Sequence, residues 1–133
     1  FGGSYESYVT TSGKTVPTIV VAINLFEAFD ETYMDLQDTF NILTREGSKY
    51  GIIFILTTNG VNFIRYKLKQ NFKQNLVLQL NDETDYSDVV GNTHGLYPSK
   101  IKGRGLIKFK DIYEFQSAKY KTNGKNNEFI KNQ

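Results

Sequence analysis

Polar residues directly follow two apolar runs of this sequence, and their side chains are the ones best suited to chemistry. Residues 18–23 are followed by Asn24, and residues 51–56 are followed by Thr57, Thr58 and Asn59. Hydroxyl and amide groups donate hydrogen bonds to phosphate oxygens and to water, and they also accept them. Continuous β-branched runs are typical of parallel strands, whose carboxyl ends form the usual ligand-binding edge of an α/β sheet. The pattern therefore predicts a polar site at the ends of two parallel strands.

The stretch Ser12-Gly13-Lys14-Thr15 contains the last three residues of a phosphate-binding loop, but its surroundings do not match that motif. The full motif requires a glycine five residues before Gly13, where Tyr8 stands, and it must open a helix. Here Pro17 and a β-branched run follow instead. The amides and helix dipole that bind phosphate are not expected at this place, so we predict that it binds none.

The run that ends at Asn24 fits the second nucleotide motif of P-loop ATPases, in which an apolar strand presents an Asp to hydrated Mg²⁺ and often a Glu to the attacking water. Asn24 and Leu25 occupy those two positions. An amide brings no negative charge to the metal side, and Leu25 has no group that orients or deprotonates water. We therefore expect poor hydrolysis. Glu27 lies two residues further, and two interpretations of it stay open, a compensating carboxylate or a solvent-facing side chain.

Several polar residues also have ordinary structural interpretations. The Thr57-Thr58-Asn59 segment either senses a terminal phosphate or simply turns the chain. His94 stands in a glycine-flanked loop and receives no role. The carboxylates of residues 82–88 lack the spacing of a calcium loop and suit the start of a helix. No metal site is predicted.

Composition excludes several classes of protein. The 133 residues have a net charge of +2 and contain one His and no Cys, which excludes disulfides, cysteine-based zinc sites and Cys/His nucleophile pairs. No run of 18 apolar residues is present, so no membrane insertion is expected from this segment. Residues 100–133 hold nine basic and three acidic residues, which suits either a solvated face or contact with a polyanion.

Alternating strands and helices predict an α/β fold with a mostly parallel sheet flanked by helices and a C-terminal β-hairpin. We expect a loop or connection over 1–16, the folded part over 17–118 and a polar linker or tail over 119–133. The strands are expected to be buried on both faces, with Asp30 capping the first long helix. The expected strands are 18–24, 51–57 and 75–80, the helices follow Asp30 to Gly47 and cover 61–72 and 82–90, and the hairpin pairs 106–109 with 112–115.

An ordered series of segments resembles the FtsK/SpoIIIE ATPases. It comprises the strand 19–24, the segment 55–59, the segment 68–80, the helix that contains Asp85 and the motif Gly103-Arg104-Gly105. Residues 43–52 and 112–118 are more similar to EssC-type motors of type VII protein secretion than to DNA pumps. The resemblance covers about residues 18–118. It implies the C-terminal part of a RecA-like ATPase module in a hexameric or tandem-repeat motor on the cytoplasmic side of a membrane-anchored secretion protein.

The resemblance also implies site residues and partners. Asn24 matches the metal-side acid, Thr57, Thr58 and Asn59 match the phosphate-sensing tip, and Arg104 matches a contact between modules. ATP and Mg²⁺ are the implied cofactors, with weak or absent binding expected in this segment. Implied partners are neighbouring modules or further copies and secreted protein substrates. The expected role is nucleotide-linked assembly or substrate docking.

Three points stay open. The phosphate-binding strand is expected to precede residue 1, so that either upstream polypeptide completes the sheet or strands 51–57 and 75–80 pair directly. The main alternative function is a double-stranded DNA translocase that contacts phosphates through Lys100, Lys102, Arg104 and Lys108. A further alternative is an unrelated Rossmann-like binding domain with a ligand at residues 57–60.

Overall fold

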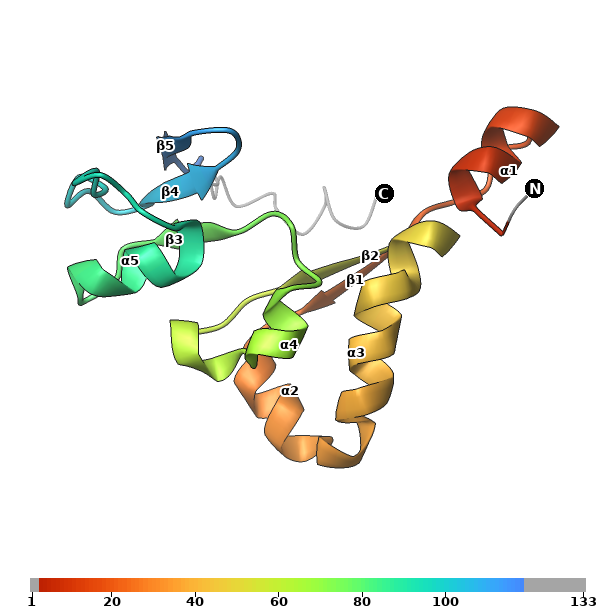
Figure 1. Cartoon of the computed structure of the whole chain (residues 1–133), viewed down its shortest axis with the longest axis horizontal. Coiled ribbons are helices and arrows are strands. Elements are labelled where there is room, and N and C mark those ends of the chain that lie inside the picture. Colours follow the sequence, from red (N-terminus) through yellow and green to blue (C-terminus); the bar gives the residue numbers. More distant parts are fainter. Residues whose placement is uncertain (1–2, 119–133) are drawn as a thin grey trace, which may run out of the picture. The chain divides into compact units, whose positions relative to one another are not determined.

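The computed structural model describes residues 3–118, which divide into two compact units, each described here by itself (Figure 1). Within the described residues, the first unit ends at Lys73 and the second begins at Gln74. The tail expected over 119–133 lies outside the described residues. The elements of the first unit are α1 (Tyr5–Ser12), β1 (Ile19–Ile23), α2 (Phe26–Thr32), the 3₁₀ helix η1 (Met34–Leu36), α3 (Gln37–Glu46), η2 (Gly47–Tyr50), β2 (Ile52–Leu56), η3 (Val61–Phe63) and α4 (Tyr66–Lys69). Those of the second are β3 (Leu76–Leu78), α5 (Glu83–Val90), β4 (Arg104–Lys108) and β5 (Ile112–Gln116).

The first unit is built on the parallel pair β1 and β2. Ile19 lies opposite Ile52, and Ile23 lies opposite Leu56. Two parallel neighbours need a crossover connection, and the segment from α2 to η2 provides it. The expected α/β class, these two strands and the C-terminal hairpin are thereby confirmed.

Only one face of this parallel pair is covered within the described residues. The core of the unit contains Phe26, Phe40 and Leu68, with Ile23, Phe29, Phe54, Leu56, Ile64 and Phe72 packed against them. On the opposite face the side chains of Val20, Ile53 and Ile55 are 56%, 49% and 51% exposed. The expectation of strands buried on both faces is therefore wrong within the first unit, because none of the described segments of that unit packs on the second face.

The helices that pack on the pair are shorter and more broken than expected. Helix α2 begins at Phe26, so Asp30 lies inside it and does not cap the next helix. The Tyr33 N–H ends α2 by donating to Phe29 O, and η1 separates it from α3. The ring centroids of Phe26, Phe29 and Phe40 lie 5.4 to 5.9 Å apart. The packing of these rings determines which faces of α2 and α3 turn toward the core. The expected helix over 61–72 is replaced by η3 and the four-residue α4.

Helix α1 occupies a segment expected to be a loop. The Ser4 hydroxyl caps its start by accepting the Ser7 N–H, and Gly13 ends it in the left-handed conformation with φ of 63°. The Tyr5 hydroxyl donates to Val16 O at 2.6 Å, and its ring packs so closely on Gly51 that a Cβ there would lie 2.5 Å from it. Local caps and one tertiary contact thus stabilise a helix that hydrophobic periodicity does not reveal.

The second unit is an antiparallel sheet in the order β3-β4-β5, with α5 packed on one face. Val77 lies opposite Leu106, and these residues form a core with Tyr86 and Val90. Direct pairing of strands 51–57 and 75–80, one of the two alternatives, is not found: β3 pairs antiparallel with β4 and not with β2. Completion of the sheet by upstream polypeptide stays a prediction. β4, which follows β3 after α5 and a long loop, satisfies the backbone groups along one edge of β3. Helix α5, by contrast, begins after Asp82 and ends before Gly91, as expected.

Among residues 3–118, no helix combines the length and the apolar character that crossing a membrane requires.

Candidate functional site

The carboxyl ends of β1 and β2 are level and bound to each other. The Thr57 N–H donates to Ile23 O at 3.0 Å, and Thr57 O accepts the Phe26 N–H at 2.8 Å. The second bond continues the connection past the last paired residues and into the first turn of α2. The residues that follow the two strands are therefore held close together.

Asn24 and Thr57 meet at this edge through their side chains. The Thr57 hydroxyl donates to Asn24 Oδ1 at 2.6 Å and accepts the Leu25 N–H at 3.1 Å. Leu25 adopts the left-handed conformation, with φ of 56° and ψ of 62°, which costs a non-glycine residue free energy. The bond from its N–H to Thr57 helps to hold this conformation. The side chain of Leu25 is 41% exposed.

The loop after β2 is shaped by its own hydrogen bonds and by one carboxylate. The Thr58 hydroxyl donates to Gly60 O at 3.1 Å, and the Asn59 N–H donates to Glu27 Oε1 at 3.2 Å. The pKa of Glu27 is lowered, first by a hydrogen bond from its own backbone N–H and further by that of Asn59, while burial acts in the opposite direction. Glu27 therefore stays ionised at neutral pH.

The structure brings together the residues that the sequence singled out at these strand ends, and it adds Glu27 to them. Asn24, Thr57, Thr58 and Asn59 all lie at one edge, but their role in binding a nucleotide stays a prediction. For Glu27, its place two residues after Leu25 was the available signal. The sequence alone could not show that the first turn of α2 directs this carboxylate toward the Asn59 amide.

The third expected strand end does not belong to this edge. Residues 80–82 lie in the second unit, where Leu80 N–H donates to the Tyr86 hydroxyl at 2.7 Å and Asp82 caps α5. Helix capping explains Asp82, and Glu83 and Asp85 lie in the first turn of the same helix. Within residues 3–118, no group of three or more His, Cys, Asp or Glu side chains is arranged to hold a metal ion. His94 is exposed in a loop of the same unit.

The groups at the strand ends fit ATP and Mg²⁺ only in part. Hydroxyl and amide donors suit contacts with phosphate oxygens and water, whereas positions 24 and 25 supply no carboxylate for a cation. The stretch Gly13-Lys14-Thr15 does not contribute to this site. Gly13 ends α1 and lies before β1, so it is at the opposite end of a strand roughly 15 Å long. The expectation that this stretch lacks the setting of a phosphate loop is thus confirmed.

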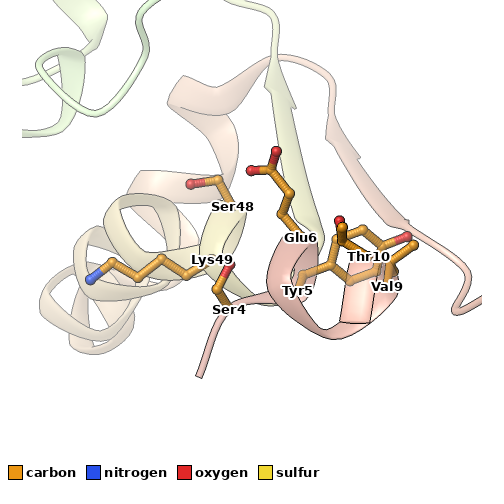
Figure 2. Close-up of a pocket in the computed structure, with 7 residues that line it drawn as sticks. All are labelled: Ser4, Tyr5, Glu6, Val9, Thr10, Ser48 and Lys49. Carbon is orange, nitrogen blue, oxygen red and sulfur yellow. The ribbon is translucent and has the colours of Figure 1, made fainter. Parts of the chain in front are cut away.

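A groove lies at the amino-terminal end of the strands, between α1 and η2 (Figure 2). It has a volume of about 560 Å³ and is lined by Ser4, Tyr5, Glu6, Val9, Thr10, Ser48 and Lys49. Glu6 comes from α1 and Lys49 from η2, on the two sides of the groove (Figure 2). Lys49 forms an ion pair with Glu46. The groove contains none of the residues at the carboxyl ends of the strands.

Arg104, the candidate contact between modules, is the first residue of β4 and not part of a loop. Its Nη1 lies 3.9 Å from Glu114 Oε1, and Glu114 also accepts the Ser99 N–H at 2.7 Å. The pKa of Glu114 is lowered, chiefly by this Ser99 hydrogen bond. Arg104 is therefore directed toward a carboxylate of its own unit.

The two glycines beside Arg104 have different structural reasons: Gly103 has a positive φ of 86°, and Gly105 is required by close packing against backbone. A Cβ at Gly103 would lie 2.4 Å from Ser117 Oγ, and one at Gly105 would lie 2.4 Å from Val77 O and 2.8 Å from the Phe115 ring. The Gly-Arg-Gly motif thus allows β4 to fit between β3 and β5. Its glycines have a structural explanation that requires no ligand.

Comparison with known proteins found similar segments in secretion proteins. The chain is 31% identical over 109 residues to the ESX secretion system protein YukB of Bacillus subtilis. The matched segment covers 81% of the chain and 7% of YukB. It is 32% identical over 102 residues to the ESX secretion system protein EccC of Geobacillus thermodenitrificans, and 25% identical over 115 residues to the type VII secretion system protein EssC of Staphylococcus aureus. The chain spans less than a tenth of the length of these relatives. No family model matches it.

Solved structures share its fold. ATPases 2 and 3 of EssC from Geobacillus thermodenitrificans superpose with a TM-score of 0.78 at 26% identity, over 98% of the chain and 25% of the solved one. The cytoplasmic domain of the type VII secretion ATPase EccC from Thermomonospora curvata gives a TM-score of 0.65 at 20% identity. The conjugation coupling protein TcpA of pCW3, solved with ATPγS, gives 0.69 at 22% identity. The latter two similarities establish the fold alone.

Proposed function

Since the chain is homologous to one segment of the type VII secretion ATPases EssC, EccC and YukB, we propose that it is part of an ATPase module whose strand-end site acts in assembly or substrate docking and not in hydrolysis. In this proposal, ATP with Mg²⁺ binds weakly and strengthens contacts between neighbouring modules. Secreted proteins are the substrates that the assembled modules dock. The segment works on the cytoplasmic side of a membrane-anchored protein.

One observation carries the proposal: the two strand ends are fully joined, yet they present no carboxylate at positions 24 and 25. Thr57 contacts both Asn24 and Leu25. The two strand ends are therefore held together, while positions 24 and 25 hold an amide and an apolar side chain where groups that activate water are expected. A site of this kind can contact phosphate oxygens, but it has nothing at these positions to deprotonate or orient the attacking water.

The exposed sheet faces support a role in assembly. The face of the parallel pair with Val20, Ile53 and Ile55 is apolar and about half exposed, and so are Leu76 and Leu78 on β3. Apolar sheet faces of this kind are normally covered in a stable protein. In this proposal, further ATPase-module polypeptide covers these exposed faces. Arg104 is the candidate polar contact between modules.

The proposal is tested by measuring phosphate release and association in the same samples. We expect no phosphate release from MgATP above the protein-free control, and a higher mean mass in sedimentation when MgATPγS is added. The variant Thr57→Val should lose the nucleotide effect on mass. Turnover on the order of 1 s⁻¹, the low end for enzymes, would contradict the proposal, and so would a mass that nucleotide leaves unchanged.

The DNA translocase alternative makes a different prediction. Lys100, Lys102 and Lys108 are exposed in the second unit, so a duplex could reach them. Binding to double-stranded DNA that weakens steeply as salt rises would favour translocation, because phosphate contacts release counterions. We expect no such binding at physiological salt.

A further inference from the structure

Glu27 is the side chain that holds Asn59 in place at the strand-end site. Its Oε1 accepts the Asn59 N–H at 3.2 Å, which joins the first turn of α2 to the loop after β2, 32 residues further along the chain. Its Oε2 is enclosed and has no hydrogen-bond partner of regular geometry among the described residues. The half-buried carboxylate therefore faces the loop and not the solvent.

Asn59 and Thr57 are held by different groups. Thr57 is bound to Ile23 and Phe26 through its backbone and to Asn24 through its hydroxyl. These bonds form without Glu27. The exposed Asn59, two residues further, is tied to α2 by the carboxylate of Glu27.

We propose that Glu27 is a positioning residue of the strand-end site, which holds Asn59 and the outer part of the 57–60 loop against α2 while Thr57 is held independently. The inference rests on the proposed function only in its consequence, that the side-chain amide of Asn59 is presented to a phosphate. Glu27 itself need not touch a nucleotide. Removing its carboxylate is expected to release Asn59 and to leave the junction of β1 and β2 intact.

The bond from Asn59 to a carboxylate has a pH signature that a purely steric role lacks. Hydrogen bonds to the ionised form lower the pKa of Glu27 below its ordinary value of 4.5. Protonation weakens the acceptor, so the Asn59 amide resonance should shift as the pH falls below 4.5. The Thr57 amide, whose acceptor is the Ile23 carbonyl, should not follow that titration.

The test is a nuclear magnetic resonance titration of the whole chain without nucleotide, on the wild type and on Glu27→Gln, Glu27→Ala and Glu31→Ala. Glu27→Gln keeps an acceptor, so Asn59 should stay protected from hydrogen exchange but lose the titration. In Glu27→Ala, we expect Asn59 to exchange about fivefold faster, as for the loss of one hydrogen bond, and Thr57 to be unchanged. Glu31, an exposed residue of the same helix, serves as the matched control and should leave both amides as in the wild type.

Each outcome decides the inference. A titration of Asn59 that persists in Glu27→Gln overturns it, and so does equal loss of protection at Thr57 and Asn59 in a folded Glu27→Ala. If Glu27→Ala does not fold, the Glu27→Gln titration decides alone. Because no nucleotide is present, a chain that shows this behaviour but does not respond to MgATPγS would refute the proposed function and retain Glu27 as the positioning residue.

Discussion

The hydroxyl of Thr57 donates to Asn24 Oδ1 at 2.6 Å while it accepts the Leu25 N–H at 3.1 Å, so one side chain joins the ends of two parallel strands. Thr57 thereby uses its donor and an acceptor position within the protein. It also supports Leu25, whose left-handed backbone is unfavourable for a residue with a branched side chain. The junction between the ends of β1 and β2 is thus organised around a hydroxyl group.

Replacing Thr57 by valine should test this arrangement. Valine keeps the shape and removes the hydroxyl, so both hydrogen bonds are lost and we expect the free energy of unfolding of the chain to fall by about 1 to 2 kcal/mol. Urea unfolding measures the change. Thr57→Ser keeps the hydroxyl and should lie within about 0.5 kcal/mol of the wild type. Equal stability of wild type and Thr57→Val would show that the hydroxyl contributes nothing.

Restoring a carboxylate at position 24 alone should not restore hydrolysis. Asn24→Asp keeps an acceptor for the Thr57 hydroxyl and adds a charge on the metal side, but Leu25 still has no group that acts on water. We expect phosphate release from MgATP to stay at the background of the wild type. Turnover in this single variant would show that the roles assigned to positions 24 and 25 are wrong.

The strands were predicted well because their signal is local. Continuous β-branched runs located β1 and β2, and the polar residues after them were correctly expected at one edge. The antiparallel partner of β3 was not foreseen, because pairing depends on which strand is available and not on the composition of β3 itself. Helix α1 was missed, since its caps at Ser4 and Gly13 and the contact of Tyr5 with Gly51 do not produce a periodic apolar pattern.

The site was predictable to the level of residue types and not of contacts. Sequence indicated Asn24 and Thr57 as neighbours at strand ends, but it left Glu27 between two interpretations. The direction of the carboxylate depends on α2 beginning at Phe26, one turn earlier than the sequence indicated. Arg104 was matched to a contact between modules by its motif, and that motif alone did not indicate its position at the start of β4.

The start of α5 should respond to acid. Asp82 accepts the Thr84 N–H at 2.8 Å, and this bond is the main reason that the pKa of Asp82 lies below its ordinary value of 3.8. A carboxyl group whose pKa is lowered by folding stabilises the fold above its unfolded value, and that contribution is lost as the pH falls through the folded value. The Thr84 amide resonance should therefore titrate below pH 3.8. In Asp82→Asn the amide oxygen still caps the helix, and the titration should vanish, whereas Asp85→Asn should leave it in place.

Gly105 should be the least replaceable of the described glycines in the second unit. A Cβ there would lie 2.4 Å from Val77 O and 2.8 Å from the Phe115 ring, and the first of these is a backbone atom that cannot move without breaking the pairing of β3 with β4. We expect Gly105→Ala to lower the free energy of unfolding of this unit by about 1 to 3 kcal/mol, the usual cost of overpacking. Gly95→Ala is the matched control, since a Cβ at Gly95 meets nothing within 4 Å and the cost comes from its φ of 83° alone. Urea unfolding followed at amide resonances of β4 measures both variants, and a Gly105→Ala protein no less stable than Gly95→Ala would show that β3, β4 and β5 do not pack this closely.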